Sequence, residues 1–195
     1  MLEIFGYISA LLSIVMIAPY VRDIFTKNTK PERASWFIWT VLTSIAFFSQ
    51  FAKGATDSLW LSAGQTLAVL IVFLLSIKYG VGGLTKRDMK ALIGAAIGLI
   101  AWYLTKEPAY ALIITIIVDG IGTWLTVIKS YQEPETETLS TFVMSGTSGI
   151  FGALAVGSWS FILLAYPAYL IIANYSIAAS ILLGRKTKSR IPASS

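Results

Sequence analysis

Cysteine and histidine are both absent from this chain of 195 residues. Their absence excludes disulfides, thiol nucleophiles, imidazole bases and most transition-metal sites. Charged residues are also scarce: they make up 13% of the chain, whereas a soluble domain carries about 25%. The hydrophobic runs contain no paired acids, which leaves little for acid–base or nucleophilic catalysis. The sequence therefore predicts a protein that is not an enzyme and that uses no cofactor and no metal.

Long hydrophobic runs are what the chain has in abundance. Hydrophobic residues make up 56% of the sequence, and the mean hydropathy is +0.74. A helix needs about 20 apolar residues to cross a bilayer. Successive runs cover residues 4–21, 36–52, 58–77, 91–105, 108–128 and 138–184. The last run is long enough for two helices with a break at Gly157-Ser158. The sequence thus predicts an all-α integral membrane protein, with seven transmembrane helices in a single domain covering residues 1–195.

The basic residues lie almost entirely on one side of these spans. Thirteen of the 15 lysines and arginines fall in alternate connections or in the basic tail 185–195, and only Lys53 and Lys106 fall on the other side. Because basic residues favour the cytoplasmic side, we expect an outside N-terminus and a cytoplasmic C-terminus in the plasma (inner) membrane. The net charge of +5 then reflects contact with anionic lipids rather than nucleic-acid binding. The sequence also allows a homo-oligomer.

An internal repeat organises the spans. Pro31-Glu32 recurs as Pro134-Glu135, 103 residues later, at the same place within a set of three spans. This offset predicts repeat one over residues 4–79, a linker helix over 91–105 and repeat two over 108–184. Four spans restore the original direction, so the two repeats are parallel. Parallel-repeat transporters hold their substrate near the bilayer midplane, between the repeats.

The segment around the end of the first span carries a resemblance to a known family. It reads Pro19-Tyr20-Val21-Arg22-Asp23, then Lys27-Asn28-Thr29-Lys30, then Ser35-Trp36. In order, spacing and placement, this segment resembles the PQ-loop/SWEET (MtN3-like) transporter superfamily. The resemblance implies three helices, a linker helix and three more helices, with transport by alternating access. The chain departs from the family pattern in having Pro19-Tyr20 for Pro-Gln, with Gly122-Thr123 at the equivalent place in repeat two. It also has no proline in its second or sixth span.

Four residues are candidates for gating: Pro19, Tyr20, Gly122 and Gly149. Pro19 and Gly122 occupy equivalent places in the two repeats, and Tyr20 follows at the cytoplasmic end of the first span. Gly149 is the middle of three glycines in the sixth span. Glycine both loosens a helix and permits close packing, so a hinge and a packing role are both open here. Membrane-edge anchoring is the alternative role for Tyr20.

Asp119 is the acid inside a predicted span. It lies nine residues before Ile128, which places it roughly 13 Å from the inner end of the span and close to the midplane. An acid there costs about 2.5–3.5 kcal/mol on insertion scales, so it should face the bundle interior or water. It suits a proton-coupling or cation-binding group. A hydrogen bond that fixes helix packing is the alternative.

Three further side chains are candidates for substrate binding. The resemblance implies that Asn174 in the seventh span holds a sugar, together with Trp159, which lies 15 residues earlier. Gln65 in the third span would supply an amide from another height, because an amide both donates and accepts hydrogen bonds. Interhelical hydrogen bonds are the alternative role for both amides. Since Met16 and Ile71 stand in repeat one where Asp119 and Asn174 stand in repeat two, we expect repeat two to hold most of the solute.

Two oppositely charged loops predict a cytoplasmic latch. The first loop carries Lys27, Lys30 and Arg33, and the equivalent loop of repeat two carries Glu133, Glu135 and Glu137. Exposed pairs contribute only about 0–1 kcal/mol each, so such a latch would bias a gate without locking it. Solvated loops that make no such contact are the alternative.

These observations predict a transporter of a small polar solute, a sugar or a similar molecule, that works by alternating access. A proton-coupled carrier of an amino acid or a cation, using Asp119, is the alternative within transport. A receptor or assembly factor on the same fold is the alternative of another class, because a fold does not dictate function.

Overall fold

Helices form all the regular structure in the computed structural model, which describes residues 1–27, 31, 33–80, 85–132 and 134–188. Their bounds are α1 (Leu2–Val15), α2 (Ala18–Phe25), α3 (Arg33–Ala52), α4 (Leu59–Tyr79), α5 (Lys86–Thr105), α6 (Pro108–Gln132), a 3₁₀ helix η1 (Pro134–Thr136), α7 (Leu139–Leu154) and α8 (Phe161–Lys188). The expected all-α class is confirmed. The long apolar run divides between α7 and α8 around Gly157, as its sequence predicts.

Four spans among the described residues are long and apolar enough to cross a membrane: Leu2–Phe25, Leu59–Tyr79, Pro108–Gln132 and Phe161–Lys188. Three shorter apolar helices accompany them: Trp36–Ala52, Leu92–Thr105 and Leu139–Leu154. Large apolar side chains cover much of the surface, as at Ile100 and Ile117, which are 57% and 58% exposed. Lipid tolerates such a surface and water does not, so length, composition and exposure all agree with a multi-span membrane protein.

The first predicted helix is two helices rather than one. α1 ends at Val15 and α2 begins at Ala18, with Met16 and Ile17 between them. Proline lacks an N–H, and its ring clashes with the carbonyl four residues earlier, so Pro19 prevents Val15 from continuing the helix. Thr141 of α7 donates a hydrogen bond to the Met16 carbonyl at 3.4 Å. The break is therefore partly satisfied by another helix.

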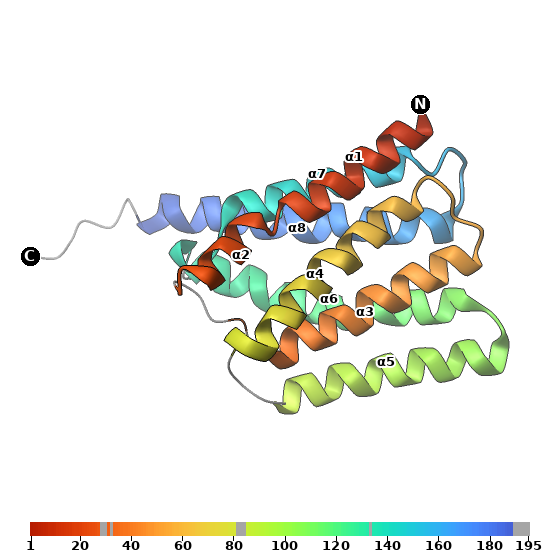
Figure 1. The fold of residues 1–195 in the computed structure, drawn as a ribbon, viewed down its shortest axis with the longest axis horizontal. Helices are drawn as coiled ribbons and strands as arrows, with labels where there is room; N and C mark the ends of the chain where they lie inside the picture. The colour runs from red at the N-terminus through yellow and green to blue at the C-terminus, as the bar shows by residue number, and fades with distance from the viewer. Residues whose placement is uncertain (28–30, 32, 81–84, 133, 189–195) are drawn as a thin grey trace, which may run out of the picture.

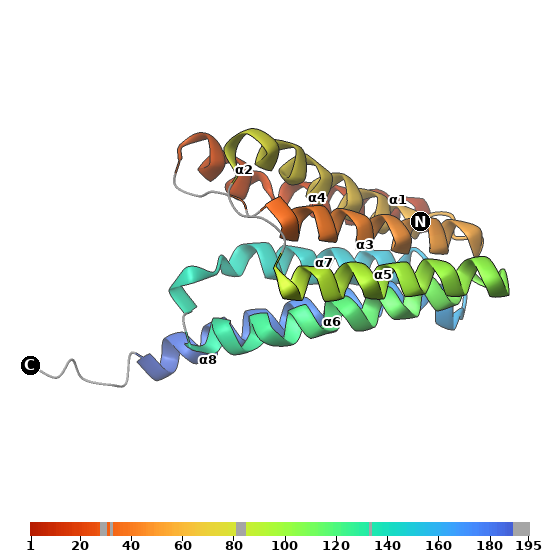
Figure 2. The same cartoon turned by 90° about the horizontal axis from the view of Figure 1, so that it is seen from below.

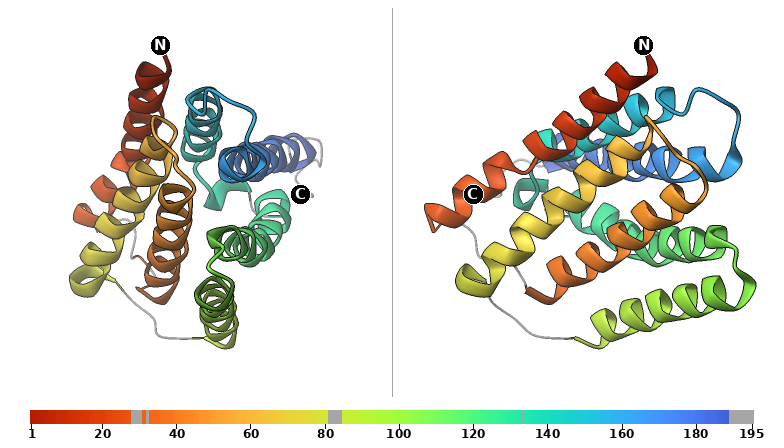
Figure 3. Two further views of the ribbon diagram at one scale, coloured as in Figure 1. Left: turned by 90° about the vertical axis from the view of Figure 1, so that its right-hand side faces the viewer. Right: turned by 45° about the vertical axis from the view of Figure 1, so that its right-hand side comes forward.

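The helices form two groups of three, which we call the first group (α1 with α2, α3 and α4) and the second group (α6, α7 and α8). In each group the last helix packs between the other two: α4 contacts α1 and α3, and α8 contacts α6 and α7. Figure 2 shows the groups as two layers, and the left panel of Figure 3 shows them end on. The remaining helix, α5, lies beside α6 and also contacts α3.

Two seams join the groups. In each seam the first helix of one group meets the second helix of the other, so the seams are α1–α7 and α3–α6. A central cluster of buried residues draws on both groups: Ala46, Leu61, Leu112, Tyr166 and Leu170. α1 begins at one end of the bundle and α8 finishes at the other (Figure 1). We call these the N-terminal end and the C-terminal end of the bundle.

Candidate functional site

Asp119 lies near the middle of α6 and is held by a side chain of α8. The Tyr169 hydroxyl donates a hydrogen bond to Asp119 Oδ2 at 2.5 Å, and the same hydroxyl lies 2.9 Å from Thr123 Oγ1. Thr123 is one turn beyond Asp119 on α6, so both face α8. An acid, a phenol and a hydroxyl thus form one hydrogen-bonded cluster.

The cluster borders a small cavity between the two groups of helices. The lining comes from α3, α6 and α8 and consists of Trp39, Leu42, Thr43, Thr115, Ile116, Asp119, Tyr166 and Tyr169. The cavity volume is about 20 Å³, which is room for roughly one water molecule. None of the eight lining residues is basic. The Asp119 carboxyl therefore faces hydroxyl groups, and no cationic side chain lines the cavity.

A buried cluster and an aromatic row flank the cavity along the length of the bundle. Toward the N-terminal end lies the central cluster, in which Leu112 and Tyr166 are almost fully buried. Toward the C-terminal end, an aromatic row runs from the cavity to α2. The Trp39 ring lies 5.1 Å from the Trp36 ring, and the Trp36 ring lies 5.1 Å from the Tyr20 ring. Packed side chains thus lie on both sides of the cavity along the bundle, although Trp39 of the aromatic row is 40% exposed.

Gln65 does not join this cavity and lies in a polar contact of its own. It is 5% exposed, and its Nε2 donates to Ser145 Oγ at 3.3 Å and to Ser148 Oγ at 3.4 Å. The two serines belong to α7, so the amide links α4 of the first group to α7 of the second. This is the interhelical hydrogen bond that the sequence left open as the alternative role.

Asn174 and Trp159 do not form the predicted pair in this structure. The Asn174 side chain is partly buried, and its Nδ2 donates to the Leu170 carbonyl of its own helix at 2.9 Å. Trp159 is 98% exposed in the connection before α8. α8 begins at Phe161, so Trp159 lies outside the helix that carries Asn174. Asn174 is on the same face of α8 as Leu170, which belongs to the central cluster.

The four candidate gating residues differ in their surroundings. Pro19 and Tyr20 follow the break in the first span. Gly122 lies within the continuous α6, and a Cβ atom there would meet nothing within 4 Å. A Cβ atom at Gly149 would lie 3.0 Å from Ile171 Cγ1 and 3.1 Å from the Pro167 carbonyl. Gly149 therefore permits close packing of α7 on α8, and α7 is continuous through it.

Two residues of the predicted latch, Arg33 and Glu135, have contacts within their own groups. Arg33 donates to the carbonyls of Ser76 and Ile77, both at 3.3 Å, near the end of α4. Glu135 lies 3.4 Å from Nε of Arg185 in α8. Lys27 is exposed just after α2. Glu137 lies between η1 and α7, and Lys30 and Glu133 lie outside the described residues. Among the described residues, each charged loop contacts the end of a helix in its own group.

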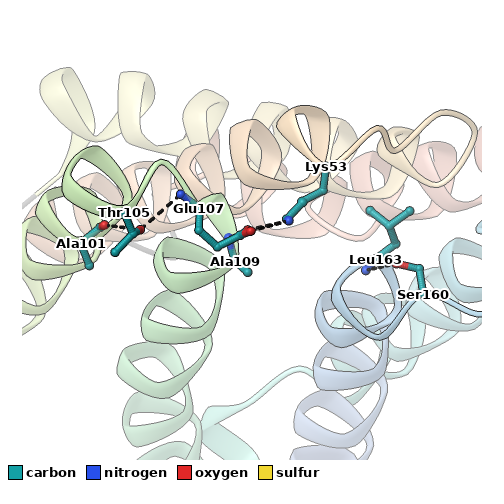
Figure 4. Close-up of polar contacts among 7 residues, drawn as sticks. All are labelled: Lys53, Ala101, Thr105, Glu107, Ala109, Ser160 and Leu163. Atoms are coloured by element: carbon teal, nitrogen blue, oxygen red, sulfur yellow. Dashed lines mark hydrogen bonds and ion pairs between the residues drawn. The ribbon is translucent and has the colours of Figure 1, made fainter.

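An ion pair between the groups lies at the N-terminal end, where the sequence predicted none. Lys53 Nζ is 2.6 Å from Glu107 Oε1 and 2.8 Å from Glu107 Oε2 (Figure 4). Glu107 Oε1 also accepts the Ala109 N–H at 3.0 Å, and the Glu107 N–H donates to Thr105 Oγ1 at 3.2 Å. The hydrogen bond from Lys53, followed by that from Ala109, lowers the pKa of the Glu107 carboxyl below its usual value.

Sequence reasoning singled out Asp119 but missed its partners Tyr169 and Thr123. One feature pointed to Tyr169: together with Tyr166 it lies inside a span, whereas tyrosine is enriched at membrane interfaces. A tyrosine hydroxyl within a bundle needs a hydrogen-bond partner. Comparisons of the chain with protein-family models, with curated proteins and with solved structures find no match.

Proposed function

We propose that this protein transports a small polar solute, a sugar or a similar molecule, by alternating access, as the PQ-loop/SWEET resemblance implies. The two moving units are residues 4–79 and 108–184, joined by the linker helix 91–105, with the N-terminal end of the bundle outside. The observation that carries the proposal is the position of the Asp119 cluster. Its acid and phenol come from α6 and α8, and the cavity beside them is completed by α3 of the other group.

The packing supports a motion between the groups. Because α3 and α6 belong to different groups, a rotation of one group against the other changes the cavity. Such a rotation opens a path either past the central cluster or past the aromatic row of Tyr20, Trp36 and Trp39. A cavity of about 20 Å³ does not hold a sugar, so binding of the solute requires a conformation with a wider cavity. Asn174 and Gln65 become accessible to the solute only when the groups separate.

One observation favours a second candidate, a carrier of an amino acid or a cation that is coupled to protons. The Asp119 carboxylate faces hydroxyl groups and no basic lining residue. A carboxylate in that setting exchanges a proton or attracts a cation without competition from a resident positive charge. In this candidate the solute and the proton are the partners. In both candidates the basic residues at the C-terminal end contact anionic lipids.

Transport by reconstituted protein tests both candidates. Proteoliposomes are assayed with sugars, amino acids and monovalent cations, each with and without a pH gradient. We expect flux of at least one neutral polar solute. For the coupled carrier, we expect flux that follows the pH gradient and falls at least about ten-fold in Asp119→Asn, the loss of roughly 1.4 kcal/mol of interaction. Glu3→Gln, which neutralises an exposed acid of α1, is the matched control and should retain its flux.

The outcomes separate the classes. Flux that depends on a pH gradient in the parent but not in Asp119→Asn assigns proton coupling to Asp119. Flux without any dependence on pH supports the uncoupled carrier. Absence of flux for every probe would contradict transport and favour a receptor or assembly factor on the same fold.

A further inference from the structure

Two polar side chains in the last turn of α3, at the N-terminal end of the bundle, are buried without full hydrogen bonding. Ser49 and Gln50 are both 0% exposed. Within the described residues, Ser49 Oγ and Gln50 Oε1 have no hydrogen-bond partner, and Gln50 Nε2 reaches only the Ala46 carbonyl at 3.4 Å. A buried polar group without a partner destabilises a structure. These two groups would be better satisfied in a conformation that gives them water or a polar ligand.

The ion pair between the groups lies directly outward of these side chains. Lys53 follows Ser49 by four residues and Gln50 by three, so all three share one side of α3. Lys53 contacts Glu107 at the start of α6, across the α3–α6 seam (Figure 4). Glu107 is fixed by its own contacts with Thr105 and Ala109. Lys53 is therefore the partner that is free to leave when the seam opens.

The same side of α3 leads inward to the Asp119 cavity. One turn further in lies Ala46, which packs in the central cluster with Leu112 and Tyr166. One turn beyond Ala46 lie Thr43 and Leu42, and both line the cavity. The order from the N-terminal end is thus a charged pair, an uncharged polar pair, an apolar barrier and the polar cavity.

The other seam lacks this arrangement. At the offset of 103 residues, Gly152, Ala153 and Val156 stand where Ser49, Gln50 and Lys53 stand, and Ile4 stands for Glu107. None of these four side chains carries a charge or a hydrogen-bonding group. Leu61 fills the space beside Gly152, since a Cβ atom there would lie 2.9 Å from Leu61 Cβ. The polar order is therefore a property of the α3–α6 seam and not of the fold in general.

We propose that the α3–α6 seam is the route from the N-terminal end to the Asp119 cavity, with Ser49 and Gln50 as an outer binding site that the Lys53–Glu107 pair closes. A hydroxyl and a carboxamide, both uncharged, match neutral solutes that carry hydroxyl or amide groups. The inference rests on the proposed transport function, because a route needs a transported solute. It deepens that function by naming the entry side, the order of contacts and a neutral solute class.

Labelling of single cysteines tests the route. The chain has no cysteine, so Ser49→Cys and Gln50→Cys each introduce a single reactive thiol. Protein in proteoliposomes is treated with a membrane-impermeant thiol reagent, and the rate of modification is measured. We expect slow modification in the parent background and a rise of about five-fold when Glu107→Gln or Lys53→Gln removes the ion pair. The exchanged pair Lys53→Glu with Glu107→Lys should restore slow modification.

Lys106→Gln is the matched control. It removes one positive charge from the same end of the bundle, but Lys106 lies over the Tyr103 ring, with Nζ 4.2 Å from the ring centroid, and outside the ion pair. Its modification rates should equal those of the parent. Equal rates in the parent, Glu107→Gln and Lys53→Gln proteins, each monodisperse and helical, would overturn the closure.

Protection by solute tests the binding site. In the Glu107→Gln background, glucose or glycerol should slow the modification of Gln50→Cys at least about two-fold, whereas sodium glutamate of equal osmolality should not. Failure of both neutral probes would overturn the outer site. Failure of the proposed function is a separate result. If no solute is transported but the modification rate still depends on the ion pair, transport is refuted, whereas the inference that the seam opens still stands.

Discussion

The two seams between the helix groups join equivalent pairs of helices by different chemistry. At the N-terminal end of the bundle the α1–α7 seam is apolar and close: the Phe5 and Phe151 rings lie 6.0 Å apart, and Leu2 fills the space beside Gly157. The α3–α6 seam has the Lys53–Glu107 pair at one end and the Asp119 cavity in the middle. An apolar seam resists opening because opening it exposes hydrocarbon, whereas an ion pair is satisfied by water as well. The α1–α7 seam therefore suits a fixed axis, and the α3–α6 seam suits the side that opens.

The first span of each group differs in the same way: one is broken and apolar, and the other is continuous and carries an acid. In the first group the span is broken between Val15 and Ala18, and apolar residues such as Met16 and Ile17 pack there. In the second group α6 runs without a break, and Asp119 stands where Met16 stands at the offset of 103 residues. A continuous helix holds its side chains in a fixed register, which suits the positioning of an acid against Tyr169. In the proposed transport cycle, the broken helix is suited to bending and the continuous helix to positioning the acid.

The largest expected effect is a loss of solute flux on substitution of Tyr169, compared with the same substitution at Tyr175 of the same helix. Tyr169→Phe removes the donor to Asp119, and a hydrogen bond to a charged group contributes about 1.5–3 kcal/mol. We expect solute flux to fall about ten-fold or more. Tyr175→Phe removes a hydroxyl that lies 2.9 Å from Thr147 Oγ1 in the α7–α8 contact. That variant should transport within about two-fold of the parent. Equal losses of flux in the two variants would contradict a special role for the α3–α6 side of the molecule.

The second effect compares two glycines at equivalent turns. Gly54 after α3 has φ +79° and Gly157 after α7 has φ +71°, which is the left-handed region that other residues adopt at a cost. Alanine at either position should cost about 1–2 kcal/mol of stability. A Cβ atom at Gly54 would meet nothing within 4 Å, whereas one at Gly157 would lie 2.5 Å from Leu2 Cδ1. Gly157→Ala should therefore cost about 1 kcal/mol more, because Leu2 must leave its rotamer.

Thermal unfolding in detergent measures that difference, and Leu2→Ala supplies its control. In the Leu2→Ala background the two alanine variants should become equally destabilising, because only the backbone strain remains. A difference that survives without Leu2 would mean that the α1–α7 seam is not what makes the second turn more sensitive.

Hydropathy and charge predicted the helices well because both are properties of local sequence. The run ending at Ala52 and the division around Gly157 follow directly from them. Asp119 was singled out for the same reason, since an acid within an apolar run is visible in one segment alone. Its partner Tyr169 was not singled out, because it lies 50 residues later in the sequence. The contact between the two residues depends on how α8 packs against α6.

The positions of Trp159 and Arg33, which were expected to belong to predicted pairings, have local causes. Trp159 lies before the first turn of α8, so counting helical turns back from Asn174 passed beyond the helix. Arg33 turns to the carbonyls of the last turn of α4, where a basic side chain is favourable. The Lys53–Glu107 pair had one visible clue: Lys53 follows the second span and Glu107 precedes the fifth, so both lie at the same end of the bundle.

The smallest expected effect is a dependence of the α3–α6 seam on pH at the N-terminal end. The hydrogen bonds from Lys53 and Ala109 lower the pKa of Glu107 from the ordinary value of 4.5. Because its pKa is lowered, Glu107 is fully ionised above pH 4.5, and its ion pair with Lys53 then contributes fully to keeping the seam closed. This contribution is lost as the pH falls through the lowered pKa of Glu107. The modification rate of Gln50→Cys should therefore stay constant from neutral pH to near that value and rise below it, after correction for thiolate content with a small-molecule thiol. In Glu107→Gln the corrected rate should be high and independent of pH. A rise of the same size in both backgrounds would assign the pH dependence to another group and would remove the ion pair as the feature that distinguishes this seam from α1–α7.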